Sequence, residues 1–544
     1  MNSGVRVAGQ INYSKFSVLV ADDFSSFRNT VNGMLGNLGV NQVQMACSAQ
    51  EAINTCKNHT FDIILCDYNL GSGRTGQHVL EELRHKRLIS RHTLFIIVSA
   101  ESSRNIVMCS YDCEPDDYLM KPITGKMLQQ RIDRLLIQRA VLTKAYRALD
   151  KHDYSTAMDV LVDLSLADDR YSSMAQKLLG TVFLQQKELD KAERLYTKAL
   201  EVRQLDWARL GLAKVKQLRG ELDVAGEWLE TIVADNPLFL PAYDVLADNW
   251  DKKGEKFNVQ YTVQRAVDIS PMSILRQKHL ANVATNNNDL ITAIDAQRRS
   301  VKLGEFSCHG IAEDHFTFAR ISSLALEREM EVDPKIGNEA LAILDAAKEQ
   351  YQLTDVQHAQ CDLLASRIHS LENRHDLAAE LLRAAESVLE ADDSGIETQL
   401  DRVLALQSAN EDEKAEKLLF QLQEKYGHDQ AALEKLDAFL NEPASDSNRE
   451  FVAAINHEGI NLYNEGKFDE ALECFEKARK LFPKHVGIQL NIVQALIGKL
   501  KIGSAEKAEA DACYSSLELV SSLVDEQHPQ YERYKRLRAM ASAF

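Results

Sequence analysis

FDIILCD, at residues 61–67, decides the fold of the first quarter of this chain: it is a short apolar run that ends in an acidic residue. Three further short apolar runs are each followed by a polar residue: FSVLVA at 16–21, LFIIV at 94–98 and DYLM at 117–120. Stretches with helical periodicity separate them. Continuous apolar runs that alternate with amphipathic helices predict parallel strands buried on both faces of a sheet. We therefore expect an α/β doubly wound domain.

A polar residue ends or follows each of these four runs. These residues are Asp22 and Asp23, Asp67, Ser99, and Lys121. Because ligands of a doubly wound sheet bind at the carboxyl ends of its strands, we expect the five side chains to lie together there. Three carboxylates in one place favour a hard divalent cation with oxygen ligands, so we predict a Mg²⁺ site. A lysine and a hydroxyl beside it can hold phosphoryl oxygens while Asp67 acts as the nucleophile.

These residues resemble the receiver domain of bacterial response regulators. The resemblance rests on the spacing of the acidic residues, on the pairs Ser99-Ala100 and Lys121-Pro122, and on the aromatic Tyr118 shortly before the lysine. It implies a flavodoxin-like receiver domain at residues 15–136, after a tail at 1–14. A histidine kinase or a phosphotransfer protein would then supply the phosphoryl group.

The resemblance also implies a role for each site residue. Asp67 would be the phosphoacceptor, which Lys121 and Ser99 assist by contacting the phosphoryl group, and Tyr118 would be the switch residue. Mg²⁺ would be held by Asp22, Asp23, Asp67 and the backbone carbonyl of Asn69. The Lys121-Pro122 peptide bond is expected to be cis.

The loop after the phosphoacceptor departs from the usual pattern of receiver domains. Residues 67–76 read DYNLGSGRTG, which is rich in glycine and about one residue longer than usual, and a proline that is common there is missing. The change removes none of the chemical groups of the site.

A helical repeat occupies the region after the receiver domain. A small residue, a large apolar residue four positions later and a small or apolar residue three further on recur along it. The first spacings between copies are 35, 33, 34 and 34 residues, typical of a helical-hairpin repeat, and the next four are 47, 38, 37 and 56. Offsets of four and three place these residues on one helix face. The copies begin at Ala157, Ala192, Ala225, Val259, Ala293, Ala340, Ala378, Ala415 and Ala471.

This region resembles an all-α tetratricopeptide repeat (TPR) superhelix. Two copies have the most matching residues. One contains Gly180, Ala192 and Tyr196, and the other contains Ala471 and Phe475. We expect TPR-like repeats at 137–440, with longer helices or loops from 305 onward. A linker rich in loop-forming residues is expected at 441–449, and a C-terminal TPR-like subdomain at 450–544.

Composition limits the function classes. The chain has 544 residues and a net charge of −18, which disfavours nucleic acid as a partner. No apolar run approaches the length of a membrane span, and no secretory signal opens the sequence, so a cytoplasmic protein is expected. Nine cysteines lack CxxC pairs and are expected to be reduced and mostly buried, including Cys109 and Cys113, which lack two further metal ligands.

The sequence thus predicts a multidomain response regulator in a two-component phosphorelay whose output is protein binding. Stacked repeats form concave surfaces that bind proteins or peptides, so we expect an unknown protein or peptide partner on the repeat surface. Phosphorylation of Asp67 would control this binding. A homodimer through the switch face is also implied by the resemblance. No enzymatic activity is expected beyond the receiver's own phosphoryl transfer and dephosphorylation. The alternative is a scaffold that acts without phosphorylation and uses the receiver as a docking module.

Overall fold

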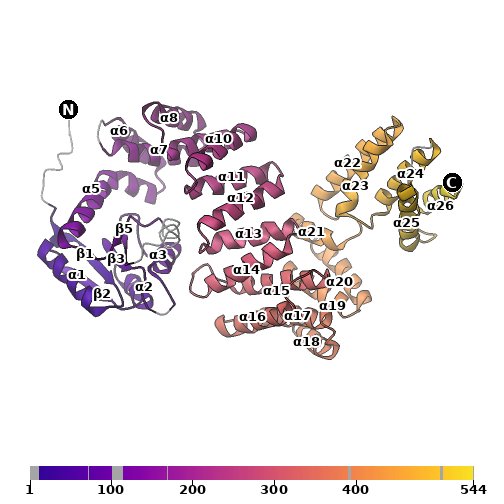
Figure 1. Cartoon of the computed structure of the whole chain (residues 1–544), viewed down its shortest axis with the longest axis horizontal. Helices are drawn as coiled ribbons and strands as arrows, with labels where there is room; N and C mark the ends of the chain where they lie inside the picture. Colours follow the sequence, from indigo (N-terminus) through magenta and orange to yellow (C-terminus); the bar gives the residue numbers. More distant parts are fainter. Residues whose placement is uncertain are drawn as a thin grey trace. The chain divides into compact units, whose positions relative to one another are not determined.

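The structure is a computed structural model that describes residues 11–71, 73–100, 114–167, 170–389, 394–502 and 507–542. The chain divides into two compact units, Met1–Tyr351 and Gln352–Phe544. The first unit contains a parallel sheet followed by helical hairpins, and the second consists of helices (Figure 1). Cys109 and Cys113, and the helix expected between the fourth and fifth strands, lie outside the described residues.

The four apolar runs of the sequence form strands of a five-stranded parallel sheet with the order β2-β1-β3-β4-β5. This is the order of a flavodoxin-like doubly wound fold, as predicted. β2 is the least buried strand, with an alternating pattern, because it lies at an edge of the sheet. The strands are β1 (Ser17–Ala21), β2 (Gln42–Ala46), β3 (Ile63–Asp67), β4 (Leu94–Ser99) and β5 (Asp117–Met120).

Helices cover both faces of the sheet. Alternate residues of β3 point to opposite sides, so that Ile63 contacts the core beneath α1 and α5, and Ile64 contacts the core beneath α2 and α3. Both side chains are fully buried. The helices are α1 (Ser25–Leu38), α2 (Ala49–Asn58), α3 (Gly76–His85) and α5 (Gly125–Asp150), and a short 3-10 helix, η1 (Tyr13–Lys15), precedes β1.

Helix α5 continues from the sheet domain into the repeats without a break. Its first half packs on the sheet through Leu128 and Ile132, and its second half packs on the next helices through Leu142 and Ala145. No proline interrupts the segment, and Thr124 caps its start by accepting a hydrogen bond from the Met127 N–H. The boundary expected between residues 136 and 137 therefore lies inside a helix.

The rest of the first unit is a series of antiparallel helix pairs in which each helix packs on the next. Its helices are α6 (Tyr154–Leu166), α7 (Ser172–Gln185), α8 (Leu189–Val202), α9 (Asp206–Leu218), α10 (Leu222–Asp235), α11 (Leu240–Lys252), α12 (Lys256–Ile269), α13 (Ile274–Asn286), α14 (Leu290–Gly304), α15 (Ala312–Glu327) and α16 (Ile336–Gln350).

The second unit continues with the same kind of helix pair. Its elements are α17 (Asp355–Leu371), α18 (His375–Leu389), α19 (Ile396–Ser408), α20 (Asp412–Lys425), α21 (Gln430–Leu436), η2 (Asp437–Phe439), α22 (Asp446–Asn464), α23 (Phe468–Leu481), α24 (Val486–Lys501), α25 (Lys507–Leu523) and α26 (Tyr531–Ala541).

The recurring sequence pattern marks one helix of each pair. The small residue that begins each copy is nearly fully buried where helices approach closely, as Ala192 in α8 and Ala471 in α23 are. The longer spacing after residue 305 arises from the segment between α14 and α15 and from the longer helices α15 and α17, which have 16 and 17 residues.

The segment expected as a linker at 441–449 is shorter in the structure, because α22 begins at Asp446. Ser445 caps this helix by accepting a hydrogen bond from the Asn448 N–H. The buried carboxylate of Asp437 accepts hydrogen bonds from the N–H groups of Ala444 and Ser445, which fixes the segment to the preceding helix. Turn-forming residues thus cap a helix here, as they do at many helix starts.

Candidate phosphorylation site

The strand ends bring the five predicted polar residues to one edge of the sheet. Asp22 and Asp23 directly follow β1, Asp67 is the last residue of β3, Ser99 is the last residue of β4, and Lys121 directly follows β5. All neighbouring strands run parallel, so these positions share an edge. The geometry follows from the sheet topology and was predictable from the apolar runs.

Lys121 bridges two of the carboxylates. Its Nζ lies 2.8 Å from Asp22 Oδ2 and 3.1 Å from Asp67 Oδ2. Both carboxylates are nearly buried, with 1% and 6% of their side-chain surface exposed. Burial tends to lower the pKa of Lys121, but its contacts with Asp22 and Asp67 outweigh this effect and raise the pKa. The ammonium group is therefore charged at neutral pH.

The carboxyl group of Asp67 has a pKa well above its ordinary value. Burial, together with the nearby carboxylates of Asp22 and Asp23, raises its pKa to about 6, although the contact with Lys121 acts in the opposite direction. One lysine does not compensate for three carboxylates that are brought together. The excess negative charge is the condition that favours a bound cation.

The residues fit a magnesium ion. Ligand oxygens of Asp22, Asp23 and Asp67 all lie within 4.8 Å of one another. Asp23 Oδ1 is buried and makes no hydrogen bond within the described part of the chain, so it can bind a cation without losing another partner. Asp22 already accepts hydrogen bonds from Lys121 and from the Phe24 N–H, so it has less capacity for a direct metal bond.

Asn69 lies in the loop after β3, where its backbone forms an isolated bridge with Thr75. The Asn69 side chain accepts a hydrogen bond from the Gly71 N–H and so stabilises the turn. Gly76 is required at the end of this loop, because a Cβ atom there would lie 2.2 Å from the carbonyl oxygen of Asp67. Gly76 thus allows the start of α3 to lie close to the backbone of Asp67.

Ser99 and Tyr118 lie on the two strands beyond Asp67. Ser99 is buried, and its carbonyl accepts a hydrogen bond from the Lys121 N–H at 2.7 Å. Tyr118 is half-buried and packs against the core on the α2 and α3 side of the sheet. The peptide bond between Lys121 and Pro122 is cis, as expected from the resemblance. The structure thus places each predicted site residue at or beside this edge, while their roles stay predictions.

One neighbour of the site was missed by the sequence analysis. The ring of Phe27, in the first turns of α1, lies under the Lys121 ammonium at 4.1 Å from Nζ to the ring centroid. This cation–π contact helps to hold the lysine over the carboxylates. The position of Phe27 one helical turn after Asp23 is a signal that could have identified it.

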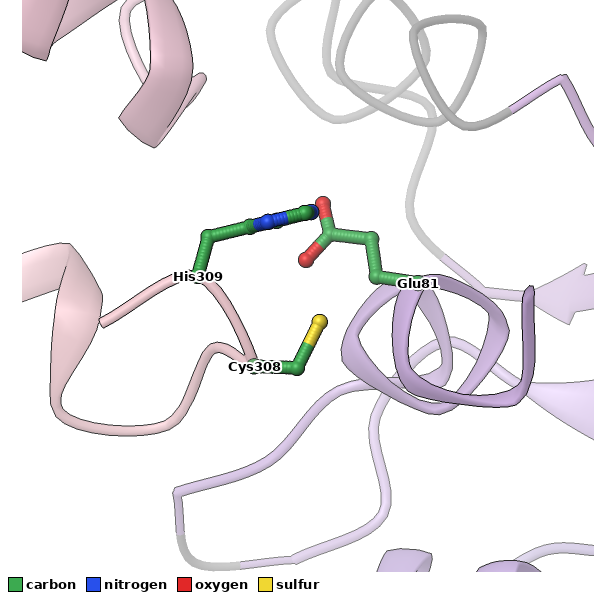
Figure 2. Close-up of side chains that lie close together, drawn as sticks. All are labelled: Glu81, Cys308 and His309. Carbon is green, nitrogen blue, oxygen red and sulfur yellow. The ribbon is translucent and has the colours of Figure 1, made fainter. Parts of the chain in front are cut away.

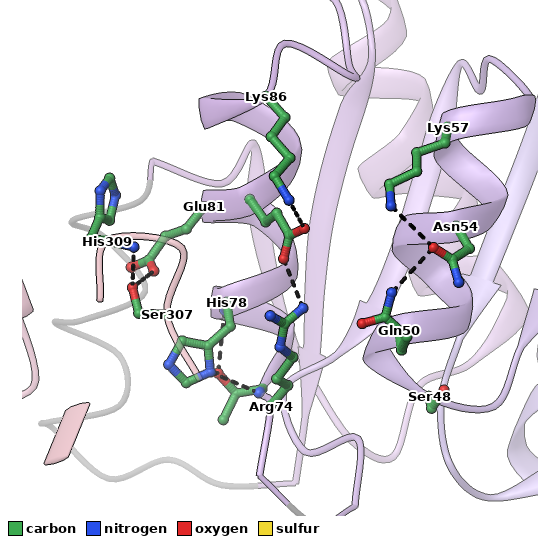
Figure 3. A network of polar contacts seen from close by, with 12 residues as sticks. Ser48, Gln50, Asn54, Lys57, Arg74, His78, Glu81, Lys86, Ser307 and His309 are labelled. Carbon is green, nitrogen blue, oxygen red and sulfur yellow. Dashed lines mark hydrogen bonds and ion pairs between the residues drawn. The ribbon is translucent and has the colours of Figure 1, made fainter. Parts of the chain in front are cut away.

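The helix after the loop that follows Asp67, α3, starts at a well-defined cap. Thr75 accepts a hydrogen bond from the His78 N–H, and the His78 ring in turn accepts one from the Thr75 N–H (Figure 3). This reciprocal pair is a capping box, in which two unpaired backbone donors are satisfied. It fixes the start of α3 at the end of the loop that follows Asp67.

Comparisons with known proteins agree with this geometry. Residues 18–133 match the response regulator receiver domain, and residues 452–485, on α22 and α23, match a tetratricopeptide repeat. The chain is 28% identical over 118 residues to the chemotaxis protein CheY-3 of Vibrio cholerae, which covers 22% of this chain and 89% of that protein. It is 26% identical over 118 residues to the chemotaxis protein CheY of Pseudomonas aeruginosa, covering 22% and 94%.

A solved structure is similar over the same region. The receiver domain protein from Methanospirillum hungatei JF-1 shares 23% identity, covers 23% of this chain and 96% of its own, and has a TM-score of 0.21. The match to the family model identifies residues 18–133 as a response regulator receiver domain. More particularly, the chain combines this receiver with a long helical region that contains a tetratricopeptide repeat.

These findings define the general class of function. A receiver domain indicates phosphorylation-dependent two-component signalling, and a tetratricopeptide repeat indicates protein binding. Receiver domains bind Mg²⁺ at an acidic pocket, and Asp22, Asp23 and Asp67 form an acidic cluster at the edge of this sheet. Among the described residues, no helix combines the length and the hydropathy needed to cross a membrane.

Proposed function

We propose that this protein is a response regulator that accepts a phosphoryl group on Asp67 and signals by binding a protein through its helical repeats. The observation that supports this most directly is the contact of Lys121 Nζ with both Asp22 and Asp67 at the edge of the sheet. It places a fixed positive charge next to a nearly buried carboxylate that is positioned as a nucleophile.

The positions of the site residues support a role for each of them in phosphoryl transfer. An oxygen of Asp67 bonds to the phosphorus of a phosphohistidine on a histidine kinase or phosphotransfer protein, as the bond from phosphorus to the histidine nitrogen breaks. Lys121 gives up its contact with one carboxylate and contacts a phosphoryl oxygen instead. The Ser99 hydroxyl donates a hydrogen bond to a second phosphoryl oxygen. Asp23 and Asp67, with Asp22 and the Asn69 carbonyl, would hold Mg²⁺, which neutralises charge between carboxylate and phosphoryl oxygens when bound.

The repeats carry the output in this proposal. Helix α12 exposes two aromatic side chains one turn apart, Phe257 and Tyr261, with 77% and 64% of their surface accessible. Neighbouring exposed aromatic residues are common where a protein binds a partner. The negative net charge supports a protein or peptide partner rather than nucleic acid.

The test is phosphorylation by a small phosphodonor. Incubation of the full chain with acetyl phosphate and Mg²⁺ should yield one phosphoryl group that is stable in acid and labile in base, as expected for an acyl phosphate. The variant Asp67→Ala should accept none, and the matched control Asp163→Asn, which changes an exposed aspartate on α6, should behave as wild type. Label that persists in Asp67→Ala would refute the assignment. Absence of label in every protein would favour a scaffold that acts without phosphorylation.

A further inference from the structure

A segment of the repeats lies against the receiver domain within the first compact unit. Residues 305–311 connect α14 and α15, and Phe306 contacts the loop that follows Asp67. The contact with Gly73 is so close that a Cβ atom there would lie 2.6 Å from the Phe306 ring. Ser307, which is largely buried, donates a hydrogen bond from Oγ to Glu81 Oε2 on α3 at 3.3 Å (Figure 3).

Three potential metal ligands meet at this contact. The Cys308 sulfur, a His309 ring nitrogen and a carboxylate oxygen of Glu81 all lie within 4.8 Å of one another. Figure 2 shows Cys308 and His309 extending from one segment toward Glu81 on α3. All three residues are half-buried, so the cluster is accessible to an ion from solution.

The positions of the ligands are supported from both sides. The Ser307 hydroxyl accepts a hydrogen bond from the His309 N–H at 3.2 Å, and Lys278 donates to the His309 carbonyl at 2.6 Å. On the receiver side, His85 lies one helical turn after Glu81, and its ring contacts that of His309 edge to face, with centroids 5.3 Å apart. Supported ligands lose less entropy when they bind an ion.

The ligand types identify the class of cation. A thiolate, an imidazole and one carboxylate form the mixed set that Zn²⁺ and similar transition metals bind, whereas Mg²⁺ prefers oxygen ligands only. Bonds of about 2.0–2.3 Å in a tetrahedral site separate the ligand atoms by roughly 3.3–3.8 Å. The ligand atoms, which lie within 4.8 Å of one another, must therefore approach by up to roughly 1.5 Å through rotation of these half-buried side chains when an ion binds. Three protein ligands leave the fourth position to water.

We propose that Glu81, Cys308 and His309 form a binding site for a divalent transition metal ion, with Zn²⁺ as the chemically best match, that links receiver helix α3 to the segment between α14 and α15. The site differs from the aspartate cluster in position and in chemistry. Because one ligand comes from the receiver and two come from the repeats, ion binding stabilises the contact between these two parts of the first unit.

The test measures binding of Zn²⁺ to the full-length protein in excess Mg²⁺, which occupies the aspartate cluster. Equilibrium competition with a zinc chelator should give one site per chain. Its affinity should fall at least about tenfold in Cys308→Ser, in His309→Ala and in Glu81→Gln, since even loss of an outer-shell partner of a metal costs about 10- to 100-fold. Co²⁺ should give a thiolate charge-transfer band that Cys308→Ser abolishes.

Matched controls test whether the effect is local. Cys47→Ser and His59→Ala change an exposed cysteine and an exposed histidine of the receiver and should leave the zinc affinity unchanged. Hydrogen exchange of α3 and residues 305–311 should slow when Zn²⁺ is added to wild type but not to Cys308→Ser. The proposal is overturned if no Zn²⁺ binds in the presence of excess Mg²⁺. It is also overturned if the Cys308 and His309 variants bind Zn²⁺ with wild-type affinity while circular dichroism shows them to be folded.

Discussion

Leu135 and Leu142 lie about two turns apart on the same helix, yet they belong to different hydrophobic cores. Leu135 packs on the receiver sheet, and Leu142 packs on the first repeat helices. Both are nearly fully buried. Because a continuous α-helix transmits rotation and translation along its axis, a movement of α5 against the sheet must also reach α6 and α7.

A flexible insertion in α5 is predicted to interrupt this connection. Gly-Ser-Gly-Ser inserted after Ala140, an exposed position between the two cores, should leave phosphorylation of Asp67 intact. Beryllofluoride, a phosphoryl mimic, should change hydrogen exchange of α6 and α7 in wild type but not in this variant. The same insertion after Gly220, in the turn between α9 and α10, is the control and should preserve the response. A response that survives insertion at Ala140 would exclude the helix as the route.

Removing the charge of Asp67 is predicted to stabilise the receiver in the absence of metal. The pKa of Asp67 is about 6 in the folded protein and about 3.9 in an unfolded chain, so folding favours the neutral carboxyl group. The stabilisation from this group is fully present below about pH 4 and is lost as the pH rises through about 6. Two pKa units correspond to about 3 kcal/mol. Asp67→Asn should therefore gain up to about 3 kcal/mol over wild type at pH 7.5 in EDTA and little at pH 4.

The measurement is amide exchange of β3, compared between the two proteins at each pH. Added Mg²⁺ should stabilise wild type and reduce the difference, because the ion binds the ionised carboxylates of the native state. An Asn variant that is less stable than wild type in EDTA at pH 7.5 would contradict the described balance of charges.

Gly76 is predicted to be intolerant of a side chain. In Gly76→Ala the new Cβ would lie 2.2 Å from the Asp67 carbonyl oxygen, so the loop after β3 must shift. We expect a loss of about 1–3 kcal/mol, as is typical of overpacking, and slower phosphorylation by acetyl phosphate. The control is Gly33→Ala in α1, where no atom lies within 4 Å of the added Cβ. That change should stabilise the helix by up to about 1 kcal/mol.

Thermal unfolding monitored by circular dichroism of the helices would combine the unfolding signals of both compact units. Amide exchange of β3 and α1 separates the two substitutions and is the appropriate readout. Equal effects of the two alanines would show that the close approach at Gly76 does not restrict the loop.

Ser99 is predicted to be needed for the response rather than for metal binding. Ser99→Ala removes a hydroxyl at the end of β4 without changing the carboxylate ligands, so Mg²⁺ affinity should stay within about twofold. The affinity for beryllofluoride should fall about ten- to hundredfold, because a hydrogen bond to a charged group contributes about 1.5–3 kcal/mol. Exchange at Tyr118 in β5 should then respond less. Ser90→Ala, outside the site, serves as control, and an unchanged affinity in Ser99→Ala would remove this residue from the proposed mechanism.

The sequence predicted those parts of the molecule that depend on local periodicity. Apolar runs located the strand ends, and parallel topology then required Asp22, Asp67 and Lys121 to meet, as they do. The pattern of small and large residues likewise located one helix of each repeat pair. Both signals arise from burial, which repeats at the period of the strand or helix.

Contacts between distant segments could not be predicted in this way. Glu81 and Cys308 are far apart in the sequence, and no periodic pattern connects them. Cys308 was therefore predicted only as one of nine reduced, mostly buried thiols, whereas in the structure it lies beside Glu81 and His309 in a half-buried cluster. Its proximity depends on how the helix pairs stack from α5 to α14, which small changes of angle at each pair determine.

The unbroken helix α5 has a practical consequence for protein engineers who wish to exchange sensory inputs. A foreign receiver cannot be joined to these repeats at an arbitrary residue, because each residue added or removed turns everything downstream by about 100° and shifts it by about 1.5 Å. Functional chimeras therefore need junctions that preserve the helical phase between Leu135 and Leu142. Libraries that vary the junction one residue at a time should show activity that recurs about every seven residues, since seven residues nearly complete two turns.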